Sequence, residues 1–246
     1  MDLALPKILG NSPLRETIFE LRFVPTIDTA GDLLPGILYS KLQKDYSEVV
    51  ALPMASVPRP IRDNNQNLRY QPSHRLSSGP HSIQIGDHSV LLQTTEYPGW
   101  GDFKSRIESL IAALNQTQLV KQIERFSFKY INLIAGSSSE QQLPLLNIKI
   151  DLIGRAPSEK GFLLREEHSE GMFTSIIQIS PNASVKIPPA NTEFSGLMID
   201  VDTIRIVGNE FWTCHASLLD EGHLAAKTKF FSLMTNPTIQ SFQPTW

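Results

Sequence analysis

Two segments far apart in the chain share one pattern, and they constrain the fold more than any other feature. In residues 13–23, PLRETIFELRF, apolar side chains and a threonine occupy alternate positions from Thr17 to Phe23, with charged residues among the others. Residues 125–134, RFSFKYINLI, begin with the same alternation of polar and aromatic side chains. Because successive side chains of a strand point to opposite sides of a sheet, each segment predicts a half-buried strand.

The charged positions of these two strands admit two interpretations. If the strands pair, Glu20 or Arg22 can form a cross-strand ion pair with Arg125 or Lys129. Such pairs hold two strands in register, which is an architectural role. Alternatively, the same charged side chains, together with Glu16, line a groove that binds a ligand.

Together the two segments resemble a sporadically distributed bacterial family of uncharacterised proteins. Members open with P-L-x-E-x-x-F-E-L-R-F and carry a central R-x-x-x-x-Y-I-N strand. The matching charged and polar positions are Glu16, Glu20, Arg22, Arg125, Tyr130 and Asn132, whereas Phe128-Lys129 replaces the more usual leucine-arginine. Sporadic occurrence is typical of defence and conflict genes, so the resemblance implies an accessory, antitoxin or immunity component.

The first half of the chain predicts an α+β arrangement of split βαβ type. A helix follows Asp28, and residues 102–118 form a second helix with an apolar stripe. Between them, Gly86-Asp87 predicts a two-residue hairpin turn that places Ile83 opposite Val90. The order strand, helix, strands, helix, strand is that of helices packed on one face of an antiparallel sheet.

The second half predicts a strand-rich fold closed by a long C-terminal helix. Residues 135–144, rich in Gly, Ser and Gln, mark the expected boundary between subdomains at 1–134 and 145–246, with one continuous domain as the alternative. The expected strands cover 146–153, 161–168, 172–180 and 197–207, and the helix covers 211–234. The fold expected is therefore two antiparallel sheet-plus-helix halves.

Composition narrows the class of protein. A chain of 246 residues with 41% hydrophobic content supplies an ordinary globular core. The net charge of −3 lacks the basic excess that favours nucleic acid, and no apolar run is long enough to span a membrane. The single cysteine, Cys214, suits a reducing compartment, which predicts a cytoplasmic protein.

The sequence contains no recognised catalytic, cofactor or metal motif. Gly-rich phosphate loops, G-x-S-x-G and H-E-x-x-H are all missing, so we expect no cofactor and lean against an enzyme. His74, His81 and His88 recur every seven residues, but Pro80 and Gly86 separate them onto different elements. The pair Asp200 and Asp202 fits either a cation site or, more simply, a bend at a sheet edge.

The best candidates for partner binding lie in and after an irregular segment. Residues 51–72 hold four prolines, a composition that resists both helix and central strand. Arginine and aromatic residues dominate interface energies, which singles out Arg69, Tyr70, His74, Arg75 and Trp100. We therefore predict a non-enzymatic protein that binds another protein. The alternative is a small-molecule binder or enzyme that uses a cavity between helix and sheet.

Overall fold

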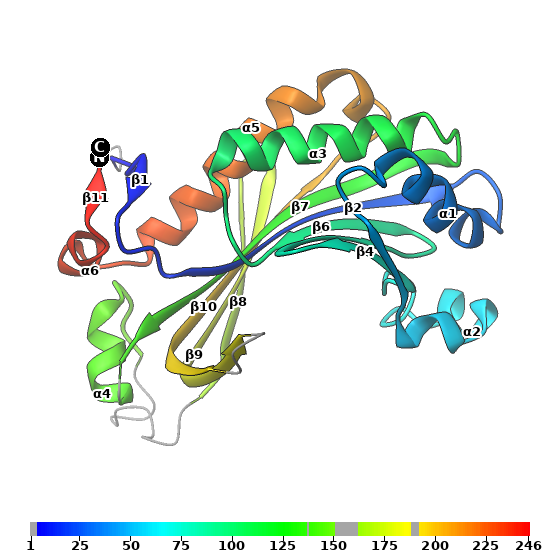
Figure 1. Ribbon diagram of the computed structural model, residues 1–246. Helices are drawn as coiled ribbons and strands as arrows, with labels where there is room; N and C mark the ends of the chain where they lie inside the picture. The colour runs from blue at the N-terminus through cyan, green and yellow to red at the C-terminus, as the bar shows by residue number, and fades with distance from the viewer. Residues whose placement is uncertain (1–3, 137, 151–161, 188–191) are drawn as a thin grey trace. The chain divides into compact units, whose positions relative to one another are not determined.

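The computed structural model describes residues 4–136, 138–150, 162–187 and 192–246, and it has the α+β class that the sequence predicts (Figure 1). The chain divides into two compact units, each built from separate parts of the sequence. The first unit comprises Met1–Arg15, Lys129–Thr203 and Gly222–Trp246, and the second comprises Glu16–Phe128 and Ile204–Glu221.

The second unit contains most of the candidate residues. Its elements are β2 (Leu14–Pro25), α1 (Ala30–Leu42), β3 (Glu48–Ala51), the 3-10 helix η1 (Pro53–Ser56), α2 (Arg59–Asn64), β4 (His74–Ser78), β5 (His81–Ile85), β6 (Ser89–Thr94), α3 (Trp100–Asn115), the start of β7 (Val120–Ala135), the end of β10 (Thr192–Ile206) and the first half of α5 (Phe211–Ser232). The strands are hydrogen-bonded in the order β3-β4-β5-β6-β2-β7. Strands β6 and β7 flank β2 and are connected through α3, which is the expected split βαβ arrangement.

The core of this unit forms where the alternating strands meet α1 and α3, which Figure 1 shows on the same side of the sheet. Phe19, Leu21 and Phe23 of β2 are fully buried, as expected from their alternate positions. Helix α3 contributes Phe103 and Ile107, both fully buried, to the same layer. The period-two pattern of the strand and the stripe of the helix are therefore both confirmed.

The first unit has a core of its own. Its elements are β1 (Ile8–Leu9), the end of β7, α4 (Ser139–Gln142), η2 (Leu143–Leu145), β8 (Leu164–Glu170), β9 (Phe173–Ile187), β10 (Thr192–Ile206), the second half of α5 (Phe211–Ser232), α6 (Asn236–Ser241) and β11 (Pro244–Thr245). The main strands follow the order β7-β10-β9-β8. Apolar residues of these strands, such as Ile179 and Ile199, form one buried cluster with Phe230 and Phe231 of α5.

Three local expectations differ from the structure. In the β5–β6 hairpin, Ile85 rather than Ile83 lies opposite Val90, because Gly86 to Ser89 form a four-residue turn closed by a 2.9 Å bond from Gly86 N to Ser89 O. The segment 51–72 contains η1 and α2, whose early prolines are compatible with a first helical turn.

The third difference concerns the strand expected over 146–153. Residues 146–150 form no strand, and only an isolated bridge joins Leu146 to Met234, while 151–153 lie outside the described residues. Among the residues that the structure describes, no helix is long and apolar enough to cross a membrane.

Candidate functional site

The second unit's sheet has a polar side facing away from α1 and α3, which we call the open face. One row of residues crosses it directly, because the strand registers pair Val50 with Arg75, Arg75 with Gln84, Gln84 with Leu91 and Leu91 with Glu20. These positions alternate with the buried core residues of the same strands. The open face thus combines charged, amide and apolar side chains on one rigid support.

Glu20 is the centre of the charged network on this face. Its carboxylate accepts a 2.9 Å bond from Nε of Arg22 and a 2.6 Å bond from an Nη of Arg125 on the neighbouring β7. The Glu20 side chain is only 13% exposed, so solvent screens these pairs less than it would on an open surface. The expected cross-strand pair is therefore present, and it fixes both arginines in place.

Tyr70 packs over the same network. The Arg22 guanidinium lies 4.1 Å from the centre of the Tyr70 ring, and that of Arg69 lies 5.8 Å away, both within the range of cation–π attraction. The Tyr70 hydroxyl donates a 3.2 Å hydrogen bond to Glu124 of β7. Burial and the neighbouring Glu124 carboxylate raise the pKa of Tyr70, so the phenol stays protonated and able to donate.

We call this group, Glu20, Arg22, Arg69, Tyr70 and Arg125, the arginine–tyrosine cluster.

Two backbone contacts place Tyr70 beside the hairpin turn between β5 and β6. Ser89 Oγ donates a 2.8 Å bond to the Tyr70 carbonyl, and a Cβ atom added to Gly86 would lie 2.9 Å from the next carbonyl, that of Gln71. The irregular segment is thus held against the sheet at the position of the cluster.

A buried ion pair anchors the segment further upstream. Arg62 of α2 binds Asp87 through two bonds of 2.6 and 3.0 Å, and both side chains are less than 10% exposed. The same guanidinium donates to the carbonyls of Met54, at 3.0 Å, and Val57, at 2.7 Å. The segment that the sequence predicts to be irregular is therefore tied to the hairpin turn by two hydrogen bonds, and two more hold the segment to itself.

The other predicted binding residues lie apart from the cluster. Arg75 is exposed on the open face, but His74, its neighbour on β4, points to the helix side and contacts Ser73 Oγ at 3.0 Å. Trp100 begins α3, where its ring packs edge-on against Phe128 and its indole donates a 2.9 Å bond to Asp220. Arg69, Tyr70 and Arg75 therefore share the open face, whereas His74 and Trp100 belong to the helix side.

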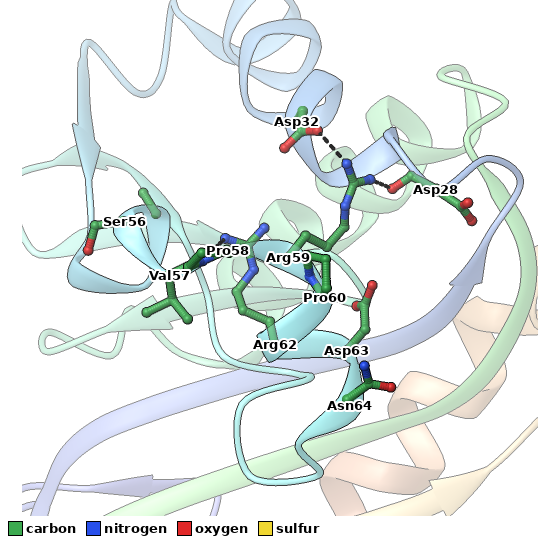
Figure 2. A pocket seen from close by; sticks show the side chains of 11 residues that line it. Asp28, Asp32, Ser56, Val57, Pro58, Arg59, Pro60, Arg62, Asp63 and Asn64 are labelled. Carbon is green, nitrogen blue, oxygen red and sulfur yellow. Dashed lines mark hydrogen bonds and ion pairs between the residues drawn. The ribbon is translucent and has the colours of Figure 1, made fainter.

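A hollow of about 750 Å³ lies between the start of α1 and the α2 region (Figure 2). Its charged side chains are largely engaged within the protein. Arg59 bonds to the Asp28 carbonyl and forms a 3.1 Å ion pair with Asp32, while Asp63 lies 3.1 Å from Nε2 of His88. The hollow is not the cavity between helix and sheet that the sequence left open as an alternative, and its arginines serve to hold the segment.

Sequence reasoning missed Glu124 and the Arg62–Asp87 pair. Neither carries a motif, and their partners are distant in the chain, with Tyr70 and Glu124 54 positions apart. For the charged residues on the strands, the alternation of side chains was the available signal, because it assigns Glu20, Arg22 and Arg125 to the polar face of the sheet.

Comparisons with protein-family models, with curated proteins and with solved structures find no match to this chain. The resemblance carried by the two strand motifs therefore stays a prediction. The function has to be argued from the site itself.

Proposed function

We propose that this chain is a non-enzymatic binding protein that recognises another protein through the open face. The observation that carries the proposal is the arginine–tyrosine cluster, in which ion pairs and ring contacts already orient two guanidiniums and an aromatic ring. A surface whose side chains are ordered before binding loses less conformational entropy when it binds. Arginine and tyrosine are also the residue types that most often dominate interface energies.

The sequence supports a proposal for the biological system and the cellular compartment in which the protein acts. The strand motifs support a bacterial protein that acts as an accessory, antitoxin or immunity component of a defence system. The single cysteine, Cys214, favours a reducing compartment, so we place the protein in the cytoplasm.

Site-specific photo-crosslinking in the native host tests the proposal. A benzoylphenylalanine at Val50, which is 41% exposed on the open face, should give a covalent adduct with one defined protein. The matched control is the same substitution at Leu33 of α1, which is 46% exposed on the helix layer. We expect the Val50 adduct alone, and we expect Tyr70→Ala to reduce its yield.

Equal adducts from Val50 and Leu33, or none from Val50, would refute binding through this face. Trp100 is left intact in these variants because it packs against Phe128, and its removal would change folding as well as binding. Far-UV circular dichroism of each variant checks that the fold is retained.

A further inference from the structure

On the open face, the hydrogen-bond acceptors of the carboxylates have partners within the protein, whereas some donors of the arginines have none among the described residues. The four carboxylates of this face each accept a hydrogen bond within the protein, and Glu20 accepts from both Arg22 and Arg125. Glu16 accepts from Gln93, Glu48 accepts from Ser77 at 3.2 Å, and Glu124 accepts from Tyr70 at 3.2 Å. Each carboxylate therefore has a donor within the protein, and that of Glu20 is paired with two arginines.

The guanidiniums retain unused donors. Within the described part of the chain, neither Arg69 nor Arg75 has an acidic side chain at ion-pair distance. Arg22 and Arg125 share the single carboxylate of Glu20. Since a guanidinium carries five N–H donors and no acceptor, the unmet capacity of this face is for an anion.

Resting on the proposed function, we infer that the partner presents an acidic segment, whose carboxylates bind Arg69 and Arg75 on the open face. Carboxylates match the planar fork of a guanidinium and form charge-assisted hydrogen bonds with it. The four glutamates interspersed on the face disfavour a continuous phosphate backbone, which would pass close to them. A protein segment can instead place its acids at the arginines and neutral residues elsewhere.

The sheet sets the spacing of such a segment. Arg75 and Glu20 belong to one cross-strand row, separated by β5 and β6. At about 4.8 Å per strand, the distance between the β4 and β2 backbones is roughly 14 Å, or about four residues of an extended chain. Leu91 and Gln84 lie between them, so the acidic positions of the partner are expected to flank about three residues, with apolar or amide side chains over Leu91 and Gln84.

Fluorescence anisotropy tests this chemistry on the full-length chain with a labelled spaced-glutamate peptide, in which three neutral residues separate successive glutamates. We expect saturable binding that weakens as salt is added, because exposed ion pairs are screened. Arg69→Gln and Arg75→Gln should each weaken binding about twofold to fivefold, as expected for a lost exposed charge contact. Lys41→Gln is the matched control, since it removes one exposed positive charge from α1 and should leave binding unchanged.

Three results would overturn the inference. These are no binding of the spaced-glutamate peptide, an equal loss in Lys41→Gln, or tighter arginine-dependent binding of inorganic phosphate or a single-stranded oligonucleotide. If the spaced-glutamate peptide fails while the Val50 crosslink to a protein persists, the acidic chemistry is wrong but protein binding stands. If the crosslink also fails, the proposed function falls with it.

Discussion

At the scale of single residues, the Arg62–Asp87 pair is the contact on which the irregular segment most depends. Its side chains are 7% and 5% exposed, and the guanidinium has four hydrogen bonds. We expect Arg62→Ala to lower the free energy of unfolding by about 3–5 kcal/mol, because it leaves the Asp87 carboxylate buried without its cation. Urea denaturation measures the change.

Arg59→Ala is the control for this substitution. Arg59 belongs to the same helix, but its partner Asp32 is 57% exposed, so the loss should be about 0–1 kcal/mol. Similar losses in the two variants would contradict the assignment of Arg62 as the anchor.

Asp200, on β10 in the first unit, predicts a dependence of stability on pH. Burial raises the pKa of its carboxyl above the ordinary value of 3.8, and the nearby Lys129, 3.3 Å away, opposes this only in part. Above 3.8, the folded state therefore holds a proton that the unfolded state has released. Stability from this group falls as the pH rises from the ordinary value through the raised pKa, and then levels off.

Asp200→Asn cannot titrate and should lack this fall. The free energy of unfolding of the native protein, minus that of the variant, should decrease across this pH range in chemical denaturation experiments. A difference that stays constant or increases with pH would show that the carboxyl is not destabilised by burial. Lys129→Met, which removes the opposing charge, should steepen the fall.

At the scale of elements, α1 contacts the turn between β5 and β6 through a helix position that has no room for a side chain. A Cβ atom on Gly31 would collide with the Asp87 side chain and lie 2.8 Å from its Cα, whereas one on Gly36 would meet nothing within 4 Å. Both glycines belong to the same helix. Substituting each glycine in turn therefore distinguishes the effect of close packing on Asp87 from the effect of helix propensity, which is common to both positions.

We expect Gly31→Ala to destabilise the protein and Gly36→Ala to stabilise it by about 0.5–1 kcal/mol. The stabilisation follows from the lower conformational entropy of alanine in the unfolded chain, while the collision at Gly31 forces the helix and the turn apart. Thermal unfolding of both variants provides the measurement. Stabilisation by Gly31→Ala would mean that α1 does not pack closely on this turn.

At the scale of the whole molecule, we expect folding to be independent of metal. Among the described residues, no group of three or more His, Cys, Asp or Glu could hold a metal ion. Adding a chelator should therefore leave the midpoint of thermal unfolding unchanged. A lower midpoint that stoichiometric zinc or magnesium restores would contradict this, and Asp200 with Asp202 would then be the first pair to mutate.

Much of the fold could be predicted because its signals are local. The alternation around Phe19 and Phe126 and the stripe of α3 report which side chains are buried, since a period of 2 or 3.6 residues maps directly onto one face of a strand or helix. The paired charges of Glu20 and Arg125 were predicted in the same way, from two strands that share a pattern. The subdomain boundaries at 1–134 and 145–246 stay a prediction.

What only the tertiary structure decided is how the irregular segment meets the sheet. The sequence by itself determined that Arg69, Tyr70 and Arg75 are arginine and aromatic candidates, and that Glu20 and Arg22 share a polar strand face. It could not place Tyr70 on Arg22 or Arg62 on Asp87, because these contacts depend on the path of a loop between strands. Periodicity carries no information about such a path, which is set by hydrogen bonds and ion pairs between residues distant in the chain.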